Sequence, residues 1–175
     1  METPEVIKRK LLAAEARLWV GTKEVGGNNC GQIIEMFQRE VDGIAMREPY
    51  CMAFVQYCVR VVDDLFAGAF PDIAVKPRGL PKTEGCVPCW MQVTVGSRQD
   101  MPSIGSIAVW QRIGDEVHGH TGIVVEINPD GFKTVEANVT SQDHREVSPG
   151  GVEYCNRVVG DTTTLRLLGF IDPWA

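Results

Sequence analysis

The sequence predicts an α+β fold, in which N-terminal helices pack on one face of a C-terminal antiparallel β-sheet. Apolar residues recur at helical spacing up to about residue 70, whereas short β-rich runs follow one another after Pro102. Consecutive short strands favour antiparallel pairing. The 175 residues are enough for one well-buried core and few for two, so we expect a single domain.

Three helices make up the predicted helical part, about 1–70. The first covers about 4–20, where apolar residues recur every three to four positions. A glycine-rich segment, 21–31, predicts a loop, and the second helix follows it and ends near 42–43. The third begins at or beside Cys51, and no glycine or proline interrupts it for four turns.

An irregular connection is predicted over about 71–102, because four prolines fall between 71 and 88. It contains Cys86 and Cys89. The chain offers neither a second pair at zinc-site spacing nor a thioredoxin-like context, so we expect these to be incidental cysteines of a surface loop. The β-rich part, about 103–175, contains five predicted strands: 106–110, 121–127, 132–138, 152–158 and 165–171.

The composition excludes two classes of partner. Seventeen Lys and Arg against 23 Asp and Glu give a net charge of −6, and the basic residues are scattered, so we expect no nucleic-acid partner. No run approaches the roughly 18 apolar residues of a membrane span, so we expect no membrane insertion. The N-terminus lacks the pattern of a signal peptide, which predicts synthesis in the cytoplasm and six reduced cysteines.

Cys51 is the candidate nucleophile. Pro49 disfavours a helical conformation at Glu48, so the helix starts sharply beside the cysteine. The first turn of a helix has unpaired N–H groups and partial positive charge, which favour a thiolate and can hold an oxyanion. The alternative is a buried core cysteine, since free cysteine is among the most buried residue types.

The sequence Asn-Pro-Asp-Gly at 128–131 predicts a tight hairpin turn. It has proline at the second turn position and glycine where a left-handed bulge residue is needed. If Asn128 pairs with Phe132, the register that follows sets Val124 opposite Glu136.

His120, Glu136 and Asn138 then point to the same face of this hairpin. A thiol that attacks an amide needs an imidazole to share its proton, and that ring needs a polar group to fix its orientation. The three residues supply both. Taken singly, an exposed histidine at a strand edge and a solvated polar face are the alternatives, and His144 lies in a polar loop without such geometry.

Four segments, in this order, resemble one known family: 50–55 (Tyr-Cys-Met-Ala-Phe-Val), 105–110 (Gly-Ser-Ile-Ala-Val-Trp), 119–125 (Gly-His-Thr-Gly-Ile-Val-Val) and 135–140 (Val-Glu-Ala-Asn-Val-Thr). They are similar to CHAP domains, which are cysteine, histidine-dependent amidohydrolases and peptidases related to the NlpC-type and papain-like enzymes. The resemblance covers roughly residue 20 to the C-terminus. It implies a papain-like fold and one catalytic domain over 1–175.

The resemblance also implies roles for the candidate residues. Cys51 is the expected nucleophile, His120 the general base, and Glu136 with Asn138 the orienting groups. Relatives mostly cleave peptidoglycan, either at the N-acetylmuramoyl-L-alanine amide or within the stem peptide and its cross-bridge. One departure is Tyr50, where relatives commonly have tryptophan.

No cofactor and no metal are expected. Some CHAP relatives bind calcium through an acidic loop just before the cysteine. Here that stretch offers only Asp42 and Glu48, which are too few carboxylates for a site of six to eight oxygens.

The resemblance leaves the biological setting open. The first expectation is a phage lysin that reaches the cell wall after release. An interbacterial effector delivered to the periplasm, with its own inhibitor or immunity protein, is the alternative, and a non-catalytic wall-binding or virion module is a third. We expect a monomer with a peptidoglycan peptide as substrate. If His120 works near its ordinary pKa, activity should centre near neutral pH and be lost in acid.

Overall fold

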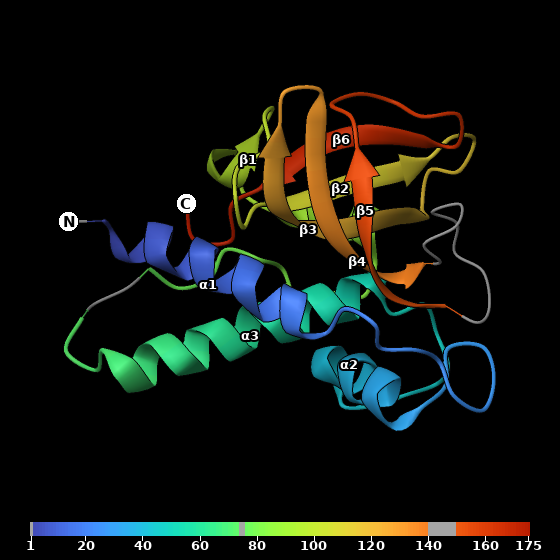
Figure 1. Cartoon of the computed structure of the whole chain (residues 1–175), viewed down its shortest axis with the longest axis horizontal. Coiled ribbons are helices and arrows are strands. Elements are labelled where there is room, and N and C mark those ends of the chain that lie inside the picture. Colours follow the sequence, from blue (N-terminus) through green and yellow to red (C-terminus); the bar gives the residue numbers. More distant parts are fainter. Residues whose placement is uncertain (1, 74–75, 140–149) are drawn as a thin grey trace.

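The computed structural model describes residues 2–73, 76–139 and 150–175 (Figure 1). The helices are α1 (Pro4–Leu18), α2 (Gln32–Asp42), α3 (Cys51–Ala69) and α4 (Cys86–Gln92), followed by the 3₁₀ turn η1 (Val95–Ser97). The strands are β1 (Arg98–Gln99), β2 (Ile107–Arg112), β3 (Gly119–Asn128), β4 (Gly131–Val139), β5 (Gly151–Arg157) and β6 (Leu165–Ile171). The fold class is therefore α+β, as the sequence predicts.

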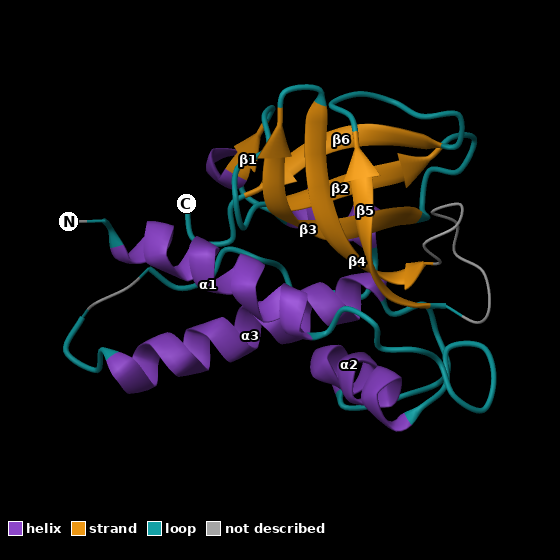
Figure 2. Ribbon diagram, viewed as in Figure 1, coloured by secondary structure: helices purple, strands orange, loops and turns teal. Residues whose placement is uncertain are grey.

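The strands form one antiparallel sheet in the order β1-β6-β2-β3-β4-β5. The helices α1, α2 and α3 lie together on one side of it (Figure 2). Both α1 and α3 contact β3, and α3 also contacts β4. The helices therefore pack on the central strands of the sheet, which brings the start of α3 close to β3.

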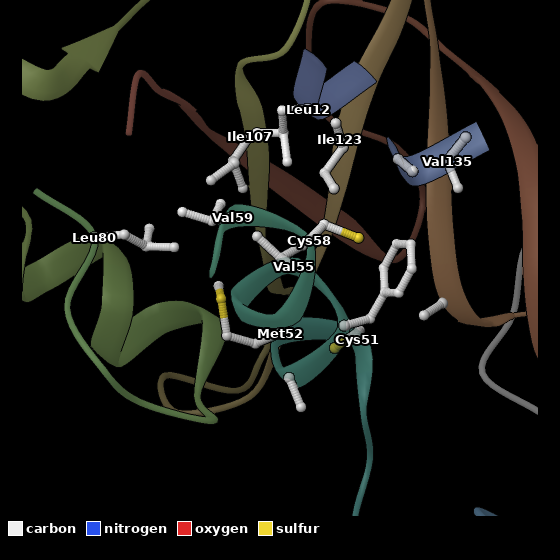
Figure 3. Close-up of a cluster of buried hydrophobic side chains, with 14 of the residues drawn as sticks. Leu12, Cys51, Met52, Val55, Cys58, Val59, Leu80, Ile107, Ile123 and Val135 are labelled. Atoms are coloured by element: carbon white, nitrogen blue, oxygen red, sulfur yellow. The ribbon is translucent and has the colours of Figure 1, made fainter. Parts of the chain in front are cut away.

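The helix α3 forms the centre of the core. Its residues from Cys51 to Gln56 are all buried, because the sheet covers one side of the helix while α1 and α2 cover the other. Figure 3 shows Val55 and Val59 of α3 among side chains from α1 and the sheet. Burial of each such aliphatic side chain contributes about 1.5–3 kcal/mol to stability.

The predicted register of the β3–β4 hairpin is wrong by one residue at the turn and by two beyond the bulge. Asn128 pairs with Gly131 rather than Phe132, and a bulge between Val124 and Glu126 shifts the pairing again, so Val124 lies opposite Thr134. Gly131 is the first residue of β4, and β5 approaches it closely: a Cβ there would lie 2.1 Å from the carbonyl oxygen of Arg157. Two single-residue shifts preserve the alternation of side chains, so the predicted sharing of one face survives.

The long connection between α3 and the sheet also differs from the expectation. It contains α4, and both cysteines of that helix are buried, Cys86 at 4% exposure and Cys89 at 0%. They are not incidental residues of a surface loop. Because α4 contacts β2 and β3, the connection becomes part of the wall beside the start of β3.

Candidate active site

Cys51 is the first residue of α3, and the chain before it is held by buried amides. The Gln38 side chain donates to the carbonyl oxygens of Glu48 at 2.7 Å and Asn29 at 3.2 Å. The Asn29 amide in turn donates to the carbonyl of Arg47 at 3.0 Å. Asn29 and Arg47 have left-handed φ values of 54° and 62°. Strained backbone of this kind persists only where surrounding contacts fix it, and here those contacts fix the start of α3.

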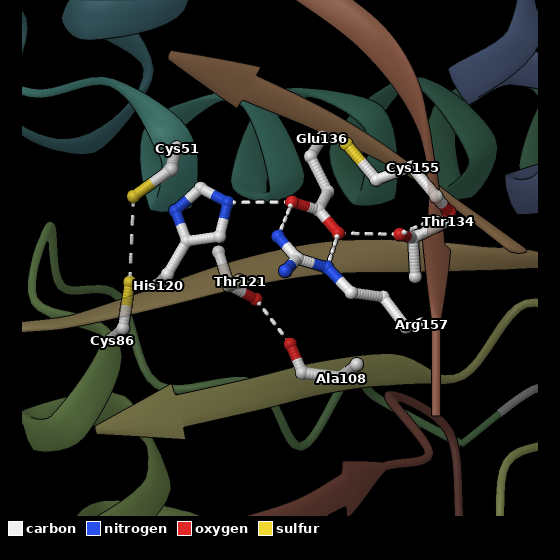
Figure 4. Close-up of polar contacts among 9 residues, drawn as sticks. All are labelled: Cys51, Cys86, Ala108, His120, Thr121, Thr134, Glu136, Cys155 and Arg157. Atoms are coloured by element: carbon white, nitrogen blue, oxygen red, sulfur yellow. Dashed lines mark hydrogen bonds and ion pairs between the residues drawn. The ribbon is translucent and has the colours of Figure 1, made fainter. Parts of the chain in front are cut away.

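His120 lies near the start of β3, with its ring between a thiol and a carboxylate (Figure 4). Its Nε2 is 2.8 Å from Oε2 of Glu136, and the other ring nitrogen faces Cys51. All three side chains are buried, at 4% exposure or less. The structure therefore brings together three of the four predicted site residues, in the order thiol, ring, carboxylate.

Glu136 is held by two further side chains. The Arg157 guanidinium donates to both of its oxygens, from Nε at 2.7 Å and from a terminal nitrogen at 2.5 Å, and Thr134 Oγ1 donates to Oε1 at 2.5 Å. Gly122 leaves room for this arrangement, since a Cβ there would lie 2.5 Å from Cγ of Glu136. Burial alone would raise the pKa of Glu136, but Arg157 and His120 keep it below its usual range, so the carboxylate is ionised.

Trp110 on β2 completes the surroundings of the ring. Its indole stacks on His120 with the ring centroids 6.1 Å apart and 25° between the planes. The guanidinium carbon of Arg157 lies 4.9 Å from the centre of the same indole. One aromatic side chain thus packs against both the imidazole and the cation that holds Glu136, which fixes the network as a unit.

The pKa shifts of Cys51 and His120 favour transfer of the thiol proton to the imidazole ring. Hydrogen bonds from Cys86 and His120 lower the pKa of the Cys51 thiol well below its usual value, although burial opposes this. Burial alone would lower the pKa of His120, but Cys51 and Glu136 raise it to about 9. The pKa of His120 thus lies above its ordinary value and that of Cys51 below, which favours a thiolate facing an imidazolium.

Asn138 is the fourth predicted site residue, and its backbone leaves the strand pattern. It has a φ of 64° and lies at a register shift between Ala137 and Val139. Asparagine tolerates this left-handed conformation better than most residues. Its backbone is next to the buried hydroxyl of Tyr50, whose pKa is raised by burial and then by the charge of Glu24. At Nε2 the His120 ring donates a hydrogen bond to the Glu136 carboxylate.

Four neighbours of the site escaped the sequence analysis: Trp110, Thr134, Arg157 and Cys86. In the sequence, Arg157 is a charged residue near the end of a predicted strand, and such a residue ordinarily indicates a solvent-exposed strand end. Thr134 shares the face of Glu136 through the two-residue alternation, so that contact was open to prediction. His144 and the last residue of the motif 135–140 lie outside the described residues.

Within 2–73, 76–139 and 150–175, no group of three or more His, Cys, Asp or Glu side chains is placed to hold a metal ion. Over the same ranges, none of the helices has the length and apolar character needed to cross a membrane.

The comparisons with known proteins agree with this geometry. A family model described as the CHAP domain matches residues 42–138, a range that spans more than half of the chain and includes Cys51, His120, Glu136 and Asn138. No curated protein and no solved structure matches. The chain therefore belongs to the CHAP family, whose domains are cysteine- and histidine-dependent amidohydrolases and peptidases.

Proposed function

We propose that this protein hydrolyses an amide bond of peptidoglycan, with Cys51 as nucleophile and His120 as its acid–base partner. The observation that carries the proposal is the buried series of thiol, imidazole and ionised carboxylate, with 2.8 Å between His120 and Glu136. This series fits acyl transfer, because the nucleophile, the base and the group that orients the base lie in contact.

Acylation begins with the Cys51 thiolate, which attacks the carbonyl carbon of the scissile amide. Negative charge then develops on the carbonyl oxygen, and the backbone N–H groups at the start of α3 are the donors available to stabilise it. The Met52 amide already donates to the Cys51 sulfur, which places it beside the reacting atoms. Protonated His120 gives its proton to the departing amine, and the C–N bond breaks.

Deacylation returns the site to its starting state. His120, now neutral, removes a proton from water, and the resulting hydroxide attacks the thioester carbon. The C–S bond breaks and the thiolate leaves with its electron pair. Glu136 keeps the ring in one orientation and stabilises its charged form during both steps, while Arg157 positions Glu136.

The proposed substrate is the peptide part of the bacterial cell wall, and this assignment derives from the CHAP family rather than from a bound ligand. Both the amide between muramic acid and L-alanine and the bonds of the stem peptide or cross-bridge suit the mechanism. We propose a phage lysin acting as a monomer. An effector delivered into the periplasm would use the same chemistry and would differ in having an inhibitor protein.

The test is digestion of purified peptidoglycan sacculi by the wild type, Cys51→Ala and Cys58→Ala, with the products identified by mass. Cys58 is a buried cysteine two turns further along α3 and serves as the matched control. Release of peptides by the wild type and Cys58→Ala, but not by Cys51→Ala, is the expected result, and the product masses name the bond. If no variant releases peptide while all three sediment with the sacculi, the protein is a wall-binding module and the enzymatic proposal fails.

A further inference from the structure

A second cysteine touches the proposed nucleophile. Sγ of Cys86 lies 3.5 Å from Sγ of Cys51, and both sulfurs are buried (Figure 4). The two residues come from different helices, since Cys51 begins α3 and Cys86 begins α4. This separation is within reach of a hydrogen bond between a thiol and a thiolate, in which one sulfur donates and the other accepts.

The surroundings decide which sulfur keeps its proton. Cys51 faces the His120 ring and receives the Met52 amide, so its negative charge has three partners when Cys86 is included. For Cys86, the contact with Cys51 and burial raise the pKa of the thiol well above the usual value. This difference favours Cys86 as the S–H donor and Cys51 as the acceptor.

Close packing holds the donor in place. A Cβ at Gly119 would lie 2.1 Å from the backbone oxygen of Trp110, 3.0 Å from the Val87 side chain and 3.3 Å from Cβ of Cys86. The absence of a side chain at Gly119 thus lets α4 lie directly against the start of β3, one residue before His120. The same strand segment that presents the imidazole also supports the helix that presents the second thiol.

We propose that Cys86 is a further residue of the reaction centre, which donates its S–H to the Cys51 thiolate and keeps the nucleophile deprotonated. This inference rests on the proposed role of Cys51. Cys86 retains its proton throughout the cycle. Its hydrogen bond weakens when Cys51 becomes a neutral thioester and forms again as the thiolate leaves, so the donor stabilises the leaving group of deacylation.

The test measures the thiolate directly and needs no substrate. Fully reduced protein is treated with iodoacetamide between pH 4 and pH 9, and the rate of alkylation of the peptide containing Cys51 is followed by mass. Loss of the donor in Cys86→Ala should shift the rate profile of Cys51 to higher pH. At acid pH the rate should fall at least about tenfold, because a hydrogen bond to a charged group is worth about one pKa unit or more.

Three variants separate the hydrogen bond from packing. Cys86→Ser keeps a donor and should recover much of the wild-type profile. Cys86→Val removes the donor while filling the space, and it replaces Cys86→Ala if the smaller side chain prevents folding. Cys89→Ala removes a fully buried thiol from the same helix and should match the wild type.

Two results would overturn the inference: a wild-type profile in both donor-free variants, or an equal shift in Cys89→Ala. The peptidoglycan proposal fails separately. If the wild type leaves sacculi intact but the alkylation profile shifts as expected, the substrate assignment is wrong while the contact between the two sulfurs retains its role.

Discussion

Single side chains set the charge of the site, and Glu136 is the most constrained of them. It is fully buried and accepts hydrogen bonds from Arg157, Thr134 and the His120 ring. A buried ion pair contributes little compared with apolar packing, but loss of one partner leaves the other charge without compensation. Glu136 therefore orients the His120 ring and also compensates the charge of the buried Arg157 guanidinium.

Substitution of Glu136 by glutamine should destabilise the protein by about 3–5 kcal/mol, because the Arg157 charge stays buried without its partner. The free energy of unfolding in urea measures this. Glu126→Gln is the control, since Glu126 pairs with Lys133 at 3.0 Å on the surface and its loss should cost less than about 1 kcal/mol. Equal losses in the two variants would contradict the role assigned to burial.

The pH dependence of kcat/KM should extend further into alkali than an ordinary histidine allows. The pKa of His120 is raised to about 9, so the imidazolium that protonates the leaving amine is present below that pH and lost above it. The acid limb reports protonation of Cys51, whose pKa is lowered. Initial rates on a soluble wall peptide at low concentration measure the profile. An alkaline limb near pH 6.5 would show that the ring is not paired with the thiolate.

Helices and strands place these side chains, and only some of these elements could be predicted from the sequence. The start of α3 beside Cys51 could be predicted because proline and then an uninterrupted apolar pattern mark it. The helix α4 could not, since it is short and contains Pro88. Sharing of one face by His120 and Glu136 could be predicted despite the wrong register, because the turn and the bulge each shift the pairing by one residue.

Asn138 and Arg157 show the limit of such reasoning. The alternation of a strand assigns every second side chain to one face, but a residue in the left-handed conformation leaves that pattern, as Asn138 does. The contact between Arg157 and Glu136 depends on the pairing of β5 with β4, which a single sequence does not encode in any local signal. Geometry that arises from distant pairing therefore stays hidden until the fold is known.

Contact between α4 and β3 depends on Gly119, and Gly119→Ala should disrupt it. The added Cβ would meet the Val87 side chain of α4 at 3.0 Å and the Trp110 backbone of β2 at 2.1 Å, so we expect a loss of about 1–3 kcal/mol in stability and a strong loss of activity at neighbouring His120. Gly68→Ala is the control, because Gly68 lies in helix α3 and, apart from the helix's own backbone, its added Cβ would meet no described atom within 4 Å. There alanine should be neutral or stabilising by up to about 1 kcal/mol. Thermal unfolding compares the two, and the idea fails if Gly119→Ala melts with the wild type.

The whole molecule couples this proton chemistry to its stability. The pKa of His120 rises from 6.5 to about 9 on folding, so its contribution is present below pH 6.5 and is lost as the pH rises to 9. The pKa of Cys51 falls on folding, so its contribution is present above pH 9 and is lost as the pH falls through the folded value. Each contribution changes the free energy of unfolding as the pH rises. Over the range in which folded Cys51 is ionised and folded His120 is protonated, the two changes have opposite signs.

In the part of the range from pH 6.5 to 9 that lies above the folded pKa of Cys51, we therefore expect the contributions of this pair to cancel, so that they leave the stability of the wild type flat. Cys51→Ser lacks the thiolate contribution. Its free energy of unfolding should fall by up to about 1.4 kcal/mol per pH unit as the pH rises from 6.5 to the pKa that His120 has in this variant. Urea unfolding at several pH values measures both. A wild type that loses stability as steeply as Cys51→Ser would mean that the thiol stays protonated.

The position of Arg157 in the chain has a consequence for synthesis. The residue belongs to β5, beyond the range 42–138 that carries the thiol, the ring and the carboxylate. When residue 138 has been synthesised, the chain already contains the Cys51 thiol, the His120 ring and the Glu136 carboxylate. The guanidinium that holds Glu136 has not yet been added. The proposed reaction centre is thus completed late in translation, and a fragment cut to the family match would carry the Glu136 carboxylate without the Arg157 cation. The working unit of this enzyme is longer than its recognisable motif.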